Sequence, residues 1–229
     1  MDERKELILN IILSDYIASG QPVASSAMVE KHALPFSPAT VRNEMAELEE
    51  EGWIMQPYTS AGRIPTEKAF VRYIATLERK PLSKREAAIL EEPTEPNSDI
   101  EALGKHSAKK LAHLSNLAVV WAFHKNHVYY TGISNLLQQP EFTTPHLVYD
   151  ISAIIDRIDE IVGDIFESVA FEPKIAIGQD CPFGSFSGTV MSRFKSGGQT
   201  GLVALIGPLR MDYEKNLARL EHVINLMKA

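Results

Sequence analysis

Cysteine is almost absent from this 229-residue chain, with Cys181 as the single one. One thiol cannot form a disulfide within the chain, which excludes a disulfide scaffold and is typical of proteins in a reducing compartment. No apolar run approaches the roughly 20 residues that cross a bilayer. The start, MDERK, lacks the apolar segment of a secretory signal. We therefore expect a cytoplasmic protein with no membrane partner.

An excess of positive charge, the simplest sign of a nucleic-acid-binding protein, is also missing. The formal net charge is -7 at pH 7, and residues 1–80 hold nine Lys and Arg against twelve Asp and Glu. A contact with DNA would therefore need a local cluster of cations, with the acidic groups facing away.

Residue clusters that would carry chemistry are not apparent in the sequence. His124 and His127 have no third metal ligand nearby. The glycine-rich stretch 197–201 lacks the lysine of a phosphate-binding loop and lies between strand patterns. We expect neither an enzyme nor a catalytic, metal or cofactor site.

Three helices are predicted in the first fifty residues. Apolar residues between positions 3 and 18 share one helical stripe, and Ser25 or Ser26 is suited to cap a second helix that ends near His32. Ser37 followed by Pro38 begins a third helix, because serine caps helices and proline is tolerated at the first helical position.

A hairpin pattern follows the third helix, which should stop at Gly52. Residues 53–58 predict a strand, residues 59–63 a tip and residues 64–65 the returning strand, and Thr66 can cap a fourth helix. The order of three helices and a hairpin predicts a winged helix-turn-helix.

The exposed face of the third helix is the predicted reading surface, since the second helix of a helix-turn-helix enters the major groove. If Val41, Met45 and Leu48 are buried, residues such as Asn43 lie opposite. Asn43 suits adenine, whereas Arg42 and Thr40 suit phosphates or a guanine edge.

The predicted wing tip at residues 59–63 suits the DNA backbone or the minor groove. It combines two hydroxyl groups, a glycine for close backbone approach and the fixed charge of Arg63, and Lys68 and Arg72 extend the positive patch. The predicted DNA contacts are Ser37, Ala39, Thr40, Arg42, Asn43, Tyr58, Thr59, Ser60, Gly62, Arg63, Lys68 and Arg72.

Carboxylates weigh against this interpretation. Glutamates at positions 44, 47, 49, 50 and 51 crowd the C-terminal half of the third helix and would repel phosphate. The alternative is that the third helix is an ordinary solvent-exposed helix and that the protein is an interaction module that has lost DNA binding.

The second half of the chain mixes both kinds of secondary structure. Prolines at 81, 93 and 96 indicate a linker over residues 80–99, with room for a helical turn at 84–91. Helices are predicted at 98–114, 151–169 and 208–228, and strands at 117–123, 128–130, 174–177, 188–194 and 201–206. We expect an α+β protein, with a winged helix-turn-helix at 1–79, the linker at 80–99 and an α+β domain at 100–229.

Several motifs resemble the heat-inducible transcription repressor family, HrcA. They are SPATVRNEMAELE at 37–49 and QPYTSAGRIPT at 56–66, preceded by DYI at 15–17 and GQPV at 20–23. In the second half, GISNLLQQPEF at 132–142 and IGPLRMDY at 206–213 are similar to the family's C-terminal motifs.

This resemblance implies a bacterial repressor of chaperone operons, found in the cytoplasm with the nucleoid. Such proteins bind double-stranded DNA at an inverted-repeat operator, the CIRCE element, as homodimers, and their C-terminal domain is GAF-like. The chaperonin GroEL assists their folding into the active form, so that heat, which diverts the chaperonin, releases repression.

The chain departs from the family pattern in one place. The family has a long inserted subdomain between the strand that matches residues 118–123 and the motif at Gly132, where this chain has only a turn and a short strand. It therefore resembles a shortened member. A ligand-sensing regulator, with a metabolite site in the C-terminal domain, remains a second alternative.

Overall fold

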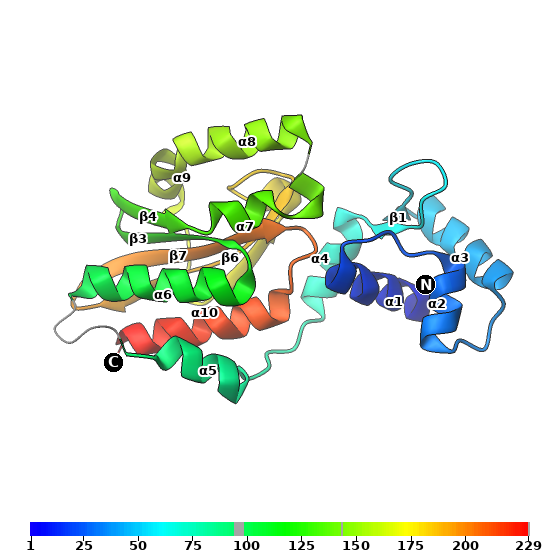
Figure 1. The fold of residues 1–229 in the computed structure, drawn as a ribbon, viewed down its shortest axis with the longest axis horizontal. Helices are drawn as coiled ribbons and strands as arrows, with labels where there is room; N and C mark the ends of the chain where they lie inside the picture. The colour runs from blue at the N-terminus through cyan, green and yellow to red at the C-terminus, as the bar shows by residue number, and fades with distance from the viewer. Residues whose placement is uncertain (94–98, 143, 229) are drawn as a thin grey trace. The chain divides into compact units, whose positions relative to one another are not determined.

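The computed structural model describes residues 1–93, 99–142 and 144–228, and it is a mixed α+β protein, as predicted (Figure 1). The chain divides into two compact units, Met1–Leu77 and Glu78–Ala229. In the described ranges, no helix has the length and apolar character needed to cross a membrane.

The first unit is a winged helix-turn-helix, as the element order predicted. Its elements are α1 (Glu3–Ser19), α2 (Ser25–His32), α3 (Pro38–Glu50), the antiparallel pair β1 (Ile54–Met55) and β2 (Ile64–Pro65), and α4 (Glu67–Ala75).

Local signals in the sequence set the limits of α3. The Ser37 hydroxyl accepts the N–H of Thr40 at 3.1 Å, and Pro38 is the first helical residue. Gly52, just beyond the helix, has a φ of +75°, which glycine adopts without strain. The predicted inner stripe of α3, at positions 41, 45 and 48, is buried against α1 and α2.

Two details of the first unit differ from the prediction. Leu7, one of the apolar residues between positions 3 and 18 predicted to share one stripe, is 43% exposed, whereas Leu9 and Leu13 are buried, because α1 is packed by α3, α4 and β2 on more than one side. In addition, neither Ser25 nor Ser26 is the N-cap residue of α2. The helix already begins at Ser25, so the N-cap residue is Ala24.

The second unit is built on a five-stranded antiparallel sheet in the order β4-β3-β7-β6-β5, a GAF-like arrangement. The strands are β3 (Ala118–His124), β4 (His127–Thr131), β5 (Lys174–Ile177), β6 (Ser187–Ser196) and β7 (Gln199–Pro208). One face is covered by α6 (Ile100–Ser115) and α10 (Tyr213–Lys228), and the other by α7 (Ile133–Leu137), α8 (Pro145–Asp156) and α9 (Ile158–Ile165) (Figure 1).

Both faces of the sheet are therefore buried, which explains the continuous apolar run of β3. Val120 faces the core under α7, α8 and α9, together with Phe142 and Phe183. Trp121 points to the opposite face, where Gly104 allows α6 to approach: a Cβ at this glycine would lie 2.8 Å from the indole nitrogen.

Two predicted elements of the second unit need correction, and one helix was missed. The helix expected at 151–169 is two helices, α8 and α9, because the backbone leaves the helical region at Arg157 (φ -114°, ψ 17°). The helix expected at 208–228 begins at Tyr213, since a turn first brings the N–H of Met211 to the carbonyl of Pro208. The short helix α7 was not predicted.

The predicted linker contains an ordered helix, α5 (Lys84–Glu91). Leu90 is buried, and the ammonium group of Lys110 on α6 donates to the carbonyls of Leu90 and Glu92 at 3.1 and 2.5 Å. Burial lowers the pKa of Lys110. Residues 94–98 of the predicted linker lie outside the described residues, and the domain limits 1–79 and 100–229 stay an interpretation.

Candidate nucleic-acid interface

The exposed face of α3 carries the side chains that the sequence assigned to reading. Ala39, Arg42, Asn43 and Ala46 are exposed, opposite the buried stripe. In the part of the chain that the structure describes, neither Arg42 nor Asn43 has a hydrogen bond or an ion pair through its side chain. Both groups are therefore available to a ligand.

Ser37 and Thr40 are engaged with each other at the start of the helix. Their hydroxyl oxygens lie 2.9 Å apart, and Thr40 is half-buried. Their first role is to hold the cap. Each hydroxyl still has capacity for a further bond to a phosphate oxygen.

The acidic half of α3 is partly neutralised by two cations of α1. Glu44 pairs with Arg4 at 3.0 Å, and Lys5 pairs with Glu47 at 2.6 Å and with Glu51 at 3.0 Å. The hydrogen bonds that Lys5 donates to Glu47 and Glu51 raise the pKa of Lys5, and the bond that Glu51 accepts from Lys5 lowers the pKa of Glu51. The pairing reduces the repulsion of phosphate that the sequence alone suggested.

The wing is fastened by its backbone to the segment that precedes α2. Val23 and Arg63 exchange two backbone hydrogen bonds, each of 2.9 Å. A Cβ at Gly62 would lie 2.5 Å from the carbonyl carbon and oxygen of Val23. The sequence assigned this glycine to a close approach to DNA; in the structure the backbone that approaches it is that of Val23.

Glu49 anchors the base of the wing. Its carboxylate accepts the Nε of Arg63 at 2.9 Å and the backbone N–H of Gln56 at 3.0 Å. The Gln56 side chain then donates to the carbonyl of Ala61 at 3.0 Å. The charge of Arg63 is therefore compensated within the protein, and this residue holds the wing as well as adding charge to it.

The wing tip itself is exposed. Tyr58 is 66% exposed, Thr59 and Ser60 are exposed, and a turn brings the N–H of Ala61 to the carbonyl of Tyr58 at 3.0 Å. Ser60 has a φ of +68°, a conformation that glycine would adopt more easily. The tip therefore presents a ring and two hydroxyl groups to solvent.

Lys68 and Arg72 form a separate cluster around Trp53, beyond the C-terminal end of α3. The Lys68 ammonium lies 4.0 Å from a ring centroid of Trp53 and donates to the carbonyl of Glu51 at 2.8 Å. Arg72 pairs with Glu6 at 2.5 Å. The structure does not bring these two cations together with Arg42 and the wing tip.

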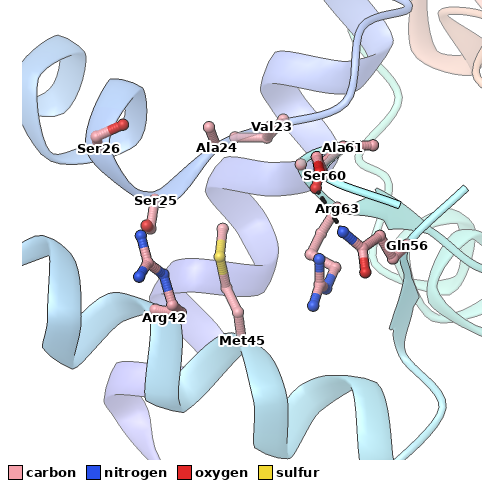
Figure 2. A pocket seen from close by; sticks show the side chains of 11 residues that line it. Val23, Ala24, Ser25, Ser26, Arg42, Met45, Gln56, Ser60, Ala61 and Arg63 are labelled. Carbon is pink, nitrogen blue, oxygen red and sulfur yellow. Dashed lines mark hydrogen bonds between the residues drawn. The ribbon is translucent and has the colours of Figure 1, made fainter. Parts of the chain in front are cut away.

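A hollow of about 350 Å³ lies between the start of α2, the middle of α3 and the wing (Figure 2). It is lined by residues 23–26, by Arg42 and Met45, and by wing residues 56 and 60–63. Residues 24–26 were not among the predicted functional residues. The pair Ser25-Ser26 was the available signal, but it suggested only a helix cap.

Comparison with known proteins identifies the family. The model of the family described as "HrcA protein C terminal domain" matches residues 68–217, more than half of the chain. The chain belongs to the HrcA family. This finding confirms the resemblance drawn from the sequence motifs.

Curated relatives carry the name heat-inducible transcription repressor HrcA. The protein from Cutibacterium acnes is 37% identical over 177 residues, which cover 74% of this chain and 51% of the relative. That from Thermobifida fusca is 40% identical over 124 residues, covering 54% of this chain and 36% of the relative. The chain thus spans about half or less of the length of these relatives.

A solved structure has the same fold over almost the whole chain. A crystal structure described as a hypothetical protein at 2.2 Å resolution superposes with a TM-score of 0.78 at 18% identity, covering 99% of this chain and 97% of the other. It shows the fold of both units.

Proposed function

We propose that this chain is a sequence-specific DNA-binding repressor of heat-shock operons. One observation carries the proposal: the exposed face of α3 presents Arg42 and Asn43 without partners among the described residues, beside an exposed wing tip. A helix face of this size fits the major groove, in which asparagine can bond bidentately to adenine. The names of the curated relatives supply the regulatory role.

The finer features come from the family resemblance. The repressor would bind an inverted-repeat CIRCE operator as a homodimer, with two recognition helices in major grooves about one helical turn, or a multiple of it, apart. Repression would act in the bacterial cytoplasm, and heat would lower the fraction of folded dimer, with GroEL assisting its recovery.

The DNA contacts that we propose fall into three groups. The face of α3 (Ala39, Thr40, Arg42 and Asn43) and the helix start at Ser37 form the first. The wing from Tyr58 to Arg63 forms the second. Lys68 and Arg72 form the third group. They lie around Trp53, so they would bind a phosphate outside the surface that the other two groups form.

The alternative of a metabolite sensor gains no support from the apolar space in the second unit. The cavity between the sheet and α8 has a volume of about 20 Å³, close to the size that one water molecule needs. A metabolite would not fit there without displacing α8.

The test compares Asn43→Ala with Asn10→Ala, a matched change at an exposed position of α1. Fluorescence anisotropy measures binding of each variant to an inverted-repeat operator duplex and to a random duplex of the same length. Asn43→Ala should cost roughly 1–3 kcal/mol on the operator and little on random DNA, because a base contact is lost. Equal losses on both duplexes would remove Asn43 from base reading.

A further inference from the structure

The hollow beside the wing is lined by a helix start whose backbone donors have no acceptor. The N-cap residue of α2, Ala24, has no acceptor in its side chain, and no described side chain caps this helix. The first helical bond runs from the N–H of Met28 to the carbonyl of Ala24 at 3.0 Å. The N–H groups of residues 25–27 precede it, so they and the positive end of the helix dipole favour an anion.

Ser25 provides an independent sign of a ligand. Its side chain lines the hollow, the residue is only 7% exposed, and its hydroxyl has no hydrogen bond to any residue within the described ranges. The hydroxyl is not one of the described buried polar atoms that lack a partner, because it faces the hollow, and it can therefore donate a hydrogen bond to an acceptor bound there. Figure 2 shows this hydroxyl on the side of the Arg42 guanidinium.

The charge that lines the hollow is positive. Arg42 supplies a guanidinium group with no carboxylate partner in the described parts of the chain, and Arg63 supplies a second whose charge Glu49 compensates. None of the described lining residues is Asp or Glu. Ser60, on the wing, adds a hydroxyl from the opposite wall, where Figure 2 places it near Gln56.

We propose that this hollow binds a backbone phosphate of DNA. The phosphate oxygens would accept hydrogen bonds from the backbone N–H groups at the start of α2, from the Ser25 hydroxyl and from the guanidinium of Arg42. The inference rests on the proposed function, and it adds a contact that does not depend on base sequence. It also assigns Arg42 to the phosphate, which leaves Asn43 as the base reader beside it.

The arrangement would fix how deeply α3 enters the groove. The wing is bonded to Val23, directly before α2, and Arg42 belongs to α3. One phosphate in the hollow therefore contacts the helix pair and lies against the wing at the same time. Contacts of this kind set the position of a protein on the duplex without reading its sequence.

Ser26→Asp separates a binding role from a structural one. An acidic residue in the first turn stabilises a helix, so the melting temperature should stay the same or rise. The same carboxylate would repel a phosphate in the hollow. Affinity should fall about tenfold for operator and random duplexes alike at about 100 mM salt, and the slope of log affinity against log salt should fall by about one unit.

Two further variants complete the design. Ser152→Asp makes the same chemical change at an exposed position of α8 in the second unit, and it should bind like the wild type. Ser25→Ala removes only the hydroxyl and should weaken binding to both duplexes by about threefold to tenfold. Melting curves of all three variants show whether the fold is kept.

Operator duplexes with a single neutral methylphosphonate locate the contact. The wild type should lose about tenfold in affinity at one backbone position in each half-site, and Ser26→Asp should lose nothing further there. Wild-type affinity and salt slope in Ser26→Asp, or a loss confined to the operator, would overturn the phosphate site while leaving DNA binding intact. Absence of any salt-dependent duplex binding by the wild type would overturn the proposed function and this inference together.

Discussion

Ion pairs join separate elements in both units of the molecule, and in the first unit they border the face of α3 that carries Arg42 and Asn43. In the second unit, ion pairs fasten one part of the unit to another: the segment from Arg79 to Glu91 is joined to α10 by pairs such as Lys80 with Glu214 at 3.1 Å and Glu86 with Arg219. In the first unit, ion pairs compensate the acidic groups of α3 and leave Arg42 and Asn43 unpaired among the described residues.

This difference indicates where a ligand binds. Polar groups in folded proteins are generally satisfied by protein or by water, so those left over on one face are candidates for contact with a partner. In the first unit they gather around the start of α2, the face of α3 and the wing. In the second unit, in contrast, α5 and α10 pair charged groups with each other, as Glu86 and Arg219 do, and these pairs hold the two helices together.

The largest expected effect comes from a substitution that destabilises the second unit and leaves the first intact. Trp121→Ala removes the largest fully buried side chain, which packs on Phe194 with ring centroids 5.1 Å apart. The loss should be about 3–5 kcal/mol in unfolding free energy, because a cavity remains. Chemical denaturation followed by circular dichroism measures it.

Tyr149→Ala is the matched control, since Tyr149 is 73% exposed on α8, and it should cost less than about 0.5 kcal/mol. Similar losses for both variants would mean that the sheet is not the core of the second unit.

A second variant tests the attachment of the wing in the first unit. Gly62→Ala places a methyl group 2.5 Å from the Val23 carbonyl, so the wing should shift and the unit should lose about 1–3 kcal/mol of stability, with weaker binding to every duplex. Gly163→Ala in α9 is the control, because the nearest atom to the added Cβ, on the flexible Lys125 side chain, lies 3.8 Å away, and it should be neutral or stabilising. An unchanged melting temperature and affinity in Gly62→Ala would contradict the packed wing.

The smallest expected effect is a pH dependence confined to the first unit. The Asp15 side chain is 13% exposed. Burial opposes its charge, but the hydrogen bonds that it accepts from Lys31 at 2.7 Å and His32 at 3.0 Å outweigh this effect and lower the pKa of Asp15. A carboxyl group whose pKa is lower in the folded state than in the unfolded state stabilises the fold. This contribution is complete above the unfolded-state pKa, near 4, and is lost as the pH falls through the folded-state pKa.

Asp15→Asn should therefore cost about 1–2 kcal/mol at pH 7, and the difference from the wild type should shrink towards pH 2. Urea denaturation at a series of pH values measures it, with Glu50→Gln, an exposed residue of α3, as the control. A difference that persists unchanged at pH 2 would show that the loss is not electrostatic.

The first unit was more predictable from sequence than the second. The limits of α3 follow from Ser37, Pro38 and Gly52, which act through local backbone geometry and need no knowledge of the tertiary fold. The packing of α5 on Lys110 depends on contacts between segments distant in sequence, which periodicity alone does not contain. The apolar spacing continues past Arg157, so periodicity did not show the break there.

The candidate site was predictable in part for the same reason. The exposed face of α3 follows from its helical period. The compensation of Arg63 by Glu49, the distance of Lys68 from the wing tip and the hollow at Ser25 arise only when separate elements come together. Formal charge in the sequence could not show which cations are already paired.

The most direct test of the account is the affinity of the wild-type protein for an inverted-repeat operator duplex, measured against salt concentration beside a random duplex. The account predicts tighter binding to the operator and, on both duplexes, an affinity that falls steeply and linearly with log salt, since several phosphates are contacted. Folded protein that binds neither duplex, or that binds with no dependence on salt, would contradict it.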